Sequence, residues 1–458
     1  MKTFPNNFVW GTATSSYQIE GGCDQDGKGP SIWDAFCSIP GKIKNGDTGN
    51  TAIDHYNQFK EDIALLKSQG FKAYRFSISW PRVLPQGRGK VNEEGIRFYN
   101  NLIDGLLEHD ITPVVTLYHW DLPLALQLES DGWLNKDIID HFTQYARLCF
   151  ERFGDRVKHW ITLNEPWVVA ILGHGQGVFA PGRVSNSEPY LAGHHLILAH
   201  ASAVDVYKNE FNHQQGIIGM SNNCDWREPL TDSEDDKNAA ERALLFFVGW
   251  FADPIYLGDY PEVMKERLGN RLPEFTPEEK ELIRGSSDFF GLNHYTTMYA
   301  AENYGKNQGG NVYGNGGLSE DQDVDLSVDK SWKLTEMKWA VVPWGCKKLL
   351  EWISKRYSYP DIYITENGCA YNDHVEDGAV HDTDRIDFYH GYLKACHEAI
   401  HIGVNLKGYF AWSMFDNFEW ASGYSLRFGI NYIDYNSLER IPKDSAYWWK
   451  GVVQKNGF

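Results

Sequence analysis

Eight short apolar segments recur along this chain, and their number and spacing constrain the fold more than any other feature. Each segment is rich in β-branched and aromatic residues and almost continuously apolar, which is typical of strands buried on both faces. We therefore predict eight parallel strands at Phe8–Trp10, Ala73–Trp80, Pro113–Trp120, Trp160–Asn164, Ile217–Ser221, Phe289–Tyr295, Ile362–Glu366 and Gly408–Trp412.

The stretches between these strands have helical character. Apolar side chains recur every three or four positions in Asp54–Lys67 and in Gly95–His109, and Gly70 is a typical helix stop. Eight strand–helix alternations predict an α/β fold, a single (β/α)8 TIM barrel. Because we find no linker or repeat, we predict one domain over residues 1–458. The Gly- and Asn-rich stretch from Tyr304 to Gly317 predicts a flexible loop at the barrel mouth.

Polar side chains collect at the C-terminal ends of the predicted strands, which a barrel gathers around one mouth. A single polar strand end is commonly a satisfied cap, but seven of eight strands share this feature, which favours a functional site. In chain order the candidates are Gln18, Arg75, His119, Trp120, Asn164, Glu165, Asn293, Tyr295, Glu366, Glu419 and Trp420, with Trp412 closing the eighth strand.

Two of the three glutamates among these candidates, Glu165 and Glu366, each end an apolar, β-branched run, and such a pair is the minimum equipment for hydrolysing a glycosidic bond. Glu366 is expected to be the ionised nucleophile, held in its charged form by Arg75 and Tyr295. Glu165 is expected to be the protonated acid, with a pKa raised by burial and by the charge of Glu366. Asn164 is placed to donate to a sugar 2-hydroxyl.

Charge and composition exclude several classes of function. A formal net charge of −19 disfavours nucleic acids, anionic membranes and strongly anionic substrates as partners. No apolar run approaches a membrane span, and the N-terminal residues lack the organisation of a signal peptide. Seven scattered cysteines without a Cys-x-x-Cys pair predict a reduced, cytoplasmic protein without a disulfide framework or structural zinc. Aromatic residues reach 14%, which by count alone favours a filled core over a sugar site.

Several motifs together resemble glycoside hydrolase family 1, the retaining β-glycosidases. They are the string from Phe8 to Gln18, Asn164-Glu165-Pro166, Thr365-Glu366-Asn367-Gly368 and the string from Gly429 to Tyr435. The resemblance runs almost end to end and implies a barrel that works by double displacement, with Glu165 as acid/base and Glu366 as nucleophile.

The resemblance also implies roles for the other positions. Arg75 and Tyr295 would tune the nucleophile, and Asn293 would support the site. Trp412 would be the stacking platform for the non-reducing sugar, and Trp339 would lie on the aglycone side. The sugar-binding positions would be Gln18, His119, Trp120, Asn164, Glu419 and Trp420.

The specific activity implied is that of a β-glucosidase acting on terminal non-reducing β-D-glucosyl residues. The expected partners are small molecules, namely aryl and alkyl β-glucosides and the cello-oligosaccharides of cellulose degradation, with no cofactor and no metal. An intact Glu165 separates the chain from the plant thioglucosidase branch. Glu419, Leu426 and Phe428 stand where the 6-phosphoglycosidase branch carries serine, lysine and tyrosine, so a phosphorylated sugar would face a carboxylate and no lysine.

Trp167 and Leu172 match positions that narrow the aglycone entrance in glucose-tolerant members, so we predict glucose tolerance; the alternative is that both merely line a loop. Gln18 and Glu419 suit either orientation of the 4-hydroxyl, which leaves β-galactosidase and β-fucosidase side activity open. The same residues would also serve transglycosylation.

Other classes of function have less support. His194, His195 and His200 lack a His-Glu-x-x-His arrangement, and Gly173–Gly177 lacks the spacing of a dinucleotide site. A non-catalytic sugar-binding barrel would typically lose one of the two glutamates, and this chain keeps both. The sequence makes no prediction of the oligomeric state.

Overall fold

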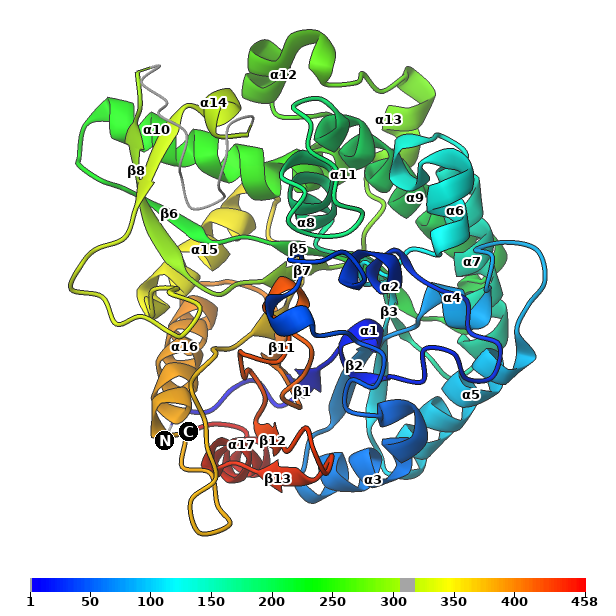
Figure 1. Cartoon of the computed structure of the whole chain (residues 1–458). Coiled ribbons are helices and arrows are strands. Elements are labelled where there is room, and N and C mark those ends of the chain that lie inside the picture. Colours follow the sequence, from blue (N-terminus) through cyan, green and yellow to red (C-terminus); the bar gives the residue numbers. More distant parts are fainter. Residues whose placement is uncertain (1, 305–317) are drawn as a thin grey trace.

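The computed structural model describes residues 2–304 and 318–458, so the loop predicted at Tyr304–Gly317 lies, from residue 305 onward, outside the described residues (Figure 1). Eight parallel strands close into a barrel in the order β1-β11-β10-β7-β5-β4-β3-β2. The predicted fold class is therefore confirmed. The barrel strands are β1 (Val9–Ala13), β2 (Ala73–Ser77), β3 (Thr112–Tyr118), β4 (His159–Asn164), β5 (Ile217–Asn223), β7 (Phe290–Asn293), β10 (Ile362–Asn367) and β11 (Leu406–Trp412).

Helices form a ring around the barrel and bury its outer face (Figure 1). The two predicted helices are confirmed as α3 and α5, and the chain reverses at Gly70 with φ of +81°. The long helices are α3 (His55–Ser68), α5 (Glu93–Glu108), α7 (Ile138–Phe153), α9 (Glu188–Glu210), α10 (Glu234–Leu244), α15 (Pro343–Arg356), α16 (Thr383–His401) and α17 (Asp444–Lys455).

Shorter helices decorate the loops between the main elements. The short α-helices are α1 (Ser16–Ile19), α2 (Ile32–Cys37), α4 (Trp80–Val83), α6 (Leu124–Ser130), α8 (Pro166–Val168), α11 (Trp250–Leu257), α12 (Glu262–Leu268), α13 (Pro277–Ile283) and α14 (Leu318–Gln322). Two π-helices span Val169–Gly175 and Leu245–Gly249, and 3₁₀ turns span Lys44–Gly46, Gly132–Leu134, Asn212–Gln214, Gly269–Arg271 and Trp420–Ser422.

Two small sheets lie outside the barrel and were not predicted. One joins β6 (Trp226–Pro229), β8 (Thr297–Glu302) and β9 (Val324–Ser327), and the other pairs β12 (Asn431–Ile433) with β13 (Arg440–Pro442). The chain ends meet beside each other, where the Lys2 amide donates to the Phe458 carbonyl at 2.8 Å (Figure 1).

The strand ends differ from the predictions at specific residues. The second strand stops at Ser77 and not at Trp80, because Trp80 and Pro81 begin helix α4. The third stops at Tyr118, and Trp120 has φ of +79°, which an extended strand does not allow. The fifth continues past Ser221 to Asn223.

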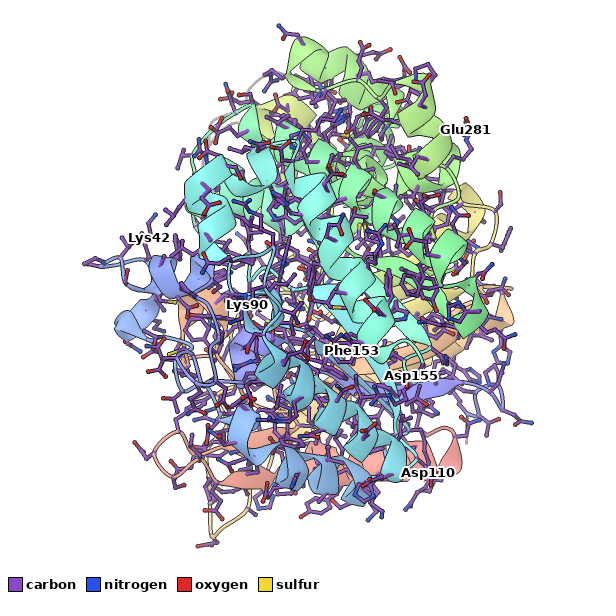
Figure 2. The ribbon with its side chains drawn as sticks, turned by 90° about the vertical axis from the view of Figure 1, so that its right-hand side faces the viewer. Lys42, Lys90, Asp110, Phe153, Asp155 and Glu281 are labelled. Atoms are coloured by element: carbon purple, nitrogen blue, oxygen red, sulfur yellow. The ribbon has the colours of Figure 1, made fainter. Side chains whose placement is uncertain are left out.

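The two ends of the barrel carry different kinds of loop. Lys42 and Lys90 lie in loops after β1 and β2, and Figure 2 shows them toward its left side. Asp110 and Asp155 precede β3 and β4, and they lie toward the right side of the same view. The C-terminal strand ends and their long loops thus share one end of the molecule, where the site residues were predicted.

Candidate active site

A cavity of about 450 Å³ opens at the C-terminal ends of the barrel strands. Gln18, Arg75 and Asn164 are fully buried and do not line this cavity, but each bonds to residues around it. The predicted residues that do line it are His119, Trp120, Glu165, Trp167, Leu172, Asn293, Tyr295, Trp339, Glu366, Trp412, Glu419 and Trp420.

Glu366 lies near the end of β10 with a donor on each carboxylate oxygen. Arg75 Nη1 donates to Oε1 at 2.6 Å, and the Tyr295 hydroxyl donates to Oε2 at 2.7 Å. Arg75 comes from β2 and its side chain is completely buried inside the barrel. Charge-assisted bonds of this kind fix the carboxylate and favour its ionised form.

Glu165 follows β4 at a sharp strand-to-helix turn, with φ of +48° and Pro166 directly after it. Its amide donates to the Ser221 carbonyl of β5 at 2.8 Å, which fixes the turn. Its side chain accepts from Asn293 Nδ2 at 2.7 Å. Positive φ in a non-glycine residue is unfavourable and is commonly retained where a side chain must be aimed at a site.

Burial raises the pKa of both catalytic candidates, and their surroundings then separate them. At Glu165 the charge of Glu366 adds to burial, so its pKa lies well above the ordinary value despite the bond from Asn293. At Glu366 burial also raises the pKa, but the charge and hydrogen bond of Arg75 and the bond from Tyr295 oppose it. Glu366 is therefore the group that ionises first, and Glu165 is the group that keeps the proton.

Asn164 connects the two glutamates to the sugar-binding candidates. Its Oδ1 accepts from Arg75 Nη2 at 2.6 Å and from Asn293 Nδ2 at 3.0 Å, and its Nδ2 donates to His119 Nε2 at 3.0 Å. Burial and the charge of Arg75 lower the pKa of His119 well below its ordinary value, so the ring is neutral. Because Nε2 accepts, Nδ1 carries the hydrogen, and that buried donor has no partner among the described residues.

The eighth strand supplies an aromatic wall. Trp412 ends β11, and the His119 ring stacks at 5.9 Å from it and at 5.9 Å from Trp420. Gly368 follows the nucleophile candidate closely, and a Cβ there would come within 1.8 Å of the Trp412 carbonyl oxygen. Only glycine therefore allows the β10 and β11 loops to approach each other at this point.

Glu419 is a third buried carboxyl in the cavity. Burial and the charge of Glu366 raise its pKa to about 8, and a hydrogen bond from Gln18 opposes this. Its Oε2 has no hydrogen-bond partner among the described residues. Gln18 Nε2 also donates to the Phe418 carbonyl at 2.9 Å, so Gln18 and Glu419 form one polar corner. The unpartnered Oε2 of Glu419 gives this corner an acceptor, or a donor when the carboxyl is protonated, to offer to a sugar hydroxyl.

The outer part of the cavity is mainly apolar and includes residues that we did not predict. Asn223 and Asp225 are polar residues in this part of the lining. Asn223 ends β5 and Asp225 follows it, and β5 is the one barrel strand for which no polar end was predicted. Extending that strand by two residues would have identified Asn223. The unpredicted apolar lining is Val168, Val178, Phe179, Phe247, Met298 and Met337.

Comparison with known proteins assigns the family. The model of glycosyl hydrolase family 1 matches residues 1–458. The chain belongs to glycosyl hydrolase family 1. The resemblance inferred from the sequence motifs is therefore confirmed.

Family 1 members from plants and bacteria are similar over almost the whole chain. Beta-glucosidase 42 of Arabidopsis thaliana is 50% identical over 99% of this chain and 95% of its own length. Beta-glucosidase A of Thermotoga maritima is 49% identical over 100% of this chain and 99% of its own. The structure of a Thermotoga maritima β-glucosidase in complex with glucoimidazole has a TM-score of 0.93, with 48% identity over 100% of both chains. A mutant of a rice β-glucosidase, with a TM-score of 0.93 and 43% identity over 98% of both chains, has been solved in a covalent complex with glucose.

Metal binding and membrane insertion are two properties that the sequence disfavoured. Among residues 2–304 and 318–458, no three or more His, Cys, Asp or Glu side chains are grouped so as to hold a metal ion. Within the same residues, no helix combines the length and apolar character needed to cross a membrane.

Proposed function

We propose that this family 1 protein is a retaining β-glucosidase that removes terminal non-reducing β-D-glucosyl residues by double displacement. The observation that carries the proposal is the unequal environment of two buried carboxyls in one cavity. Glu366 receives two donors, one of them charged, whereas Glu165 receives a neutral amide. This inequality suits a nucleophile paired with a proton donor.

In the first step, a Glu366 carboxylate oxygen attacks the anomeric carbon as the bond to the glycosidic oxygen breaks. Glu165 gives its proton to that oxygen, so the aglycone leaves as a neutral alcohol. The positive charge that develops on the sugar ring is stabilised by Glu366 until the covalent bond forms. A neutral His119 and Asn164 are available to bind sugar hydroxyls near the reacting carbon.

In the second step, Glu165 is ionised and acts as a base toward water. It removes a proton as the water oxygen attacks the anomeric carbon and releases Glu366. The product keeps the β configuration, and both carboxyls return to their starting protonation states. A sugar hydroxyl in place of water gives transglycosylation by the same route.

The substrate class follows from the two halves of the cavity. Glu419 and Gln18 suit unphosphorylated 4- and 6-hydroxyls, because a 6-phosphate would meet a carboxyl at Glu419 and an apolar side chain, not a lysine, at Leu426. The apolar outer lining around Trp167 and Trp339 suits aryl and alkyl aglycones and the faces of cello-oligosaccharides. Galactosides and fucosides are side substrates in this proposal. We also propose a cytoplasmic location, supported by seven cysteines, all with free thiols.

The test is a panel of p-nitrophenyl β-glycosides, comprising the glucoside, its 6-phosphate, the galactoside and the fucoside, with Glu366→Gln as control. We expect turnover of the glucoside, loss of it in the variant, and a first product that NMR identifies as β-glucose. Turnover of the 6-phosphate alone would overturn the assignment of Glu419. A first product of α configuration would overturn retention.

A further inference from the structure

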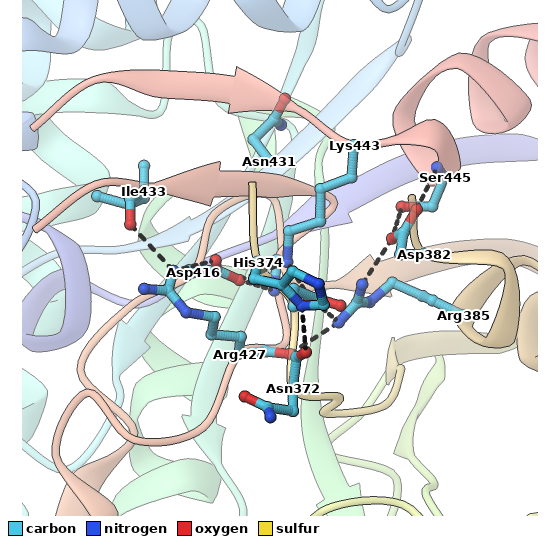
Figure 3. Close-up of polar contacts among 12 residues, drawn as sticks. Asn372, His374, Asp382, Arg385, Asp416, Arg427, Asn431, Ile433, Lys443 and Ser445 are labelled. Atoms are coloured by element: carbon cyan, nitrogen blue, oxygen red, sulfur yellow. Dashed lines mark hydrogen bonds and ion pairs between the residues drawn. The ribbon is translucent and has the colours of Figure 1, made fainter. Parts of the chain in front are cut away.

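Six charged side chains are joined by ion pairs; all six side chains are buried except that of Arg427, which is partly exposed, and all except Asp373 are labelled in Figure 3. They join segments that are far apart in sequence: the stretch after β10, the start of α16, the loop after β11 and the segment that leads into α17. We call them the charge network. Its members are Asp373, Asp382, Arg385, Asp416, Arg427 and Lys443.

Asp416 closes the base of the loop that carries Glu419 and Trp420. Its Oδ2 accepts from Arg427 Nη1 at 2.7 Å, and its Oδ1 accepts from the Gly429 amide at 2.9 Å. A Cβ on Gly429 would come within 2.0 Å of the Asp416 nitrogen, so the two ends of the loop touch. The position of Glu419 therefore depends on how Asp416 is held.

Lys443 holds Asp416 from the far side of the network. Its Nζ donates to Asp416 Oδ1 at 2.8 Å and to Asp373 Oδ2 at 2.5 Å, and its side chain is completely buried. Asp373 belongs to the segment that follows Glu366. A single ammonium group thus ties the loop that carries Glu419 to the segment that follows the nucleophile.

Arg385 makes a second, parallel tie. The Arg385 Nη2 group donates to Asp373 Oδ2 at 2.7 Å and to the Arg427 carbonyl oxygen at 2.8 Å. Burial alone would raise the pKa of Asp373, but the charges of Arg385 and Lys443 lower it below its ordinary value. The network therefore balances three cations against three anions, and removal of one member leaves an uncompensated buried charge.

We propose that Lys443 is a positioning residue for glycone selectivity, because it fixes the loop that carries Glu419 relative to the segment that follows Glu366. This inference rests on the proposed function, in which Glu419 binds the 4- and 6-hydroxyls. It goes beyond that function by assigning selectivity to a residue that does not line the cavity.

The experiment compares p-nitrophenyl β-glucoside with p-nitrophenyl β-xyloside, which lacks the hydroxymethyl group. Lys443→Met is expected to lower the glucoside-to-xyloside ratio of kcat/KM about tenfold, mainly through KM for the glucoside. Arg356→Met is the matched control, since Arg356 makes a two-pronged ion pair with Asp253 that joins α15 to α11 outside the site. It should lower the melting temperature and leave the ratio unchanged.

Two further variants separate positioning from stability. Asp373→Asn/Lys443→Met restores the charge balance, so it should recover melting temperature but not the ratio. If Lys443→Met does not fold, Asp373→Asn alone should lower the ratio in the same direction. A folded variant with an unchanged ratio, or recovery of the ratio in the double variant, would overturn the role of Lys443. Failure of the wild type to hydrolyse either glycoside would instead overturn the proposed function.

Discussion

At the scale of single residues, the chemistry depends on which carboxyl keeps a proton. Glu366 has an arginine and a tyrosine as donors, and Glu165 has only the Asn293 amide. The two groups are alike in lying at the C-terminal ends of buried strands, Glu366 within β10 and Glu165 directly after β4. Their hydrogen bonds separate them, which gives each a different expected response to mutation and to pH.

Replacing the two glutamates should produce different dependences on the leaving group. Glu366→Ala should abolish turnover of activated and unactivated glucosides alike, because no nucleophile remains. Glu165→Ala should lose about 10²- to 10⁴-fold on alkyl glucosides and much less in the first step with 2,4-dinitrophenyl glucoside, which needs no protonation. Pre-steady-state kinetics on both substrates measures this. Equal losses in both variants across leaving groups would reverse or remove the assigned roles.

The proton affinity of Glu165 should depend on the charge of Glu366. That charge is the second cause, after burial, of the raised pKa of Glu165. Glu366→Gln should therefore lower the pKa of Glu165, and ¹³C NMR of labelled glutamate carboxyls can follow its titration. In the wild type the acidic limb of kcat/KM should report Glu366 and the alkaline limb Glu165. Glu419→Gln is the control, and an unchanged Glu165 pKa in Glu366→Gln would contradict the coupling.

At the scale of elements, the segment after β4 lines part of the cavity. Helix α8 and the π-helix Val169–Gly175 present Trp167 and Leu172 to the cavity. If these side chains narrow the aglycone side, free glucose should bind there weakly, and the wild-type inhibition constant should exceed the low-millimolar range. Leu172→Ala should lower that constant several-fold, whereas Val178→Ala, in the same cavity but more exposed, should not. A low-millimolar constant for the wild type would exclude glucose tolerance.

Most of the barrel could be predicted because strands buried on both faces have an unmistakable composition. The errors arose where apolar residues continue into turns, as at Trp80 and Trp120, since burial and strand structure are then no longer the same signal. The small sheet of β6, β8 and β9 escaped prediction because its strands are only partly buried.

Some site residues could be predicted from the sequence and others could not. Residues at strand ends could be placed at the mouth because barrel closure brings those ends together. The charge network could not be predicted, since Asp373 and Lys443 meet only through the packing of distant segments. No local pattern distinguishes these two from solvated surface charges. A single sequence does not show which distant segments pack against each other.

At the scale of the whole molecule, buried carboxyls fall into two groups with opposite effects on stability. Asp62, bonded to His55 and Arg440, has a pKa that these partners lower against the effect of burial. Asp121 Oδ2 accepts from the Ser16 hydroxyl at 2.7 Å, and its Oδ1 has no partner among the described residues. Burial raises the pKa of Asp121 from 3.8 to about 7. Paired carboxyls stabilise the fold when ionised, and an unpaired one destabilises it.

The sign of the pH dependence follows for Asp121. Between pH 3.8 and about 7 the folded protein keeps a proton that the unfolded chain releases, so stability falls as the pH rises through this window. Above it the ionised group costs at most about 4 kcal/mol of the free energy of unfolding. Asp121→Asn keeps an oxygen for Ser16 and removes the charge, so it should raise the melting temperature more at pH 8 than at pH 5. Asp62→Asn should lower the melting temperature at both values. Thermal melts at constant ionic strength measure these changes. If Asp121→Asn raised the melting temperature equally at both pH values, the burial of an ionised Asp121 carboxyl would have to be offset by water or a cation.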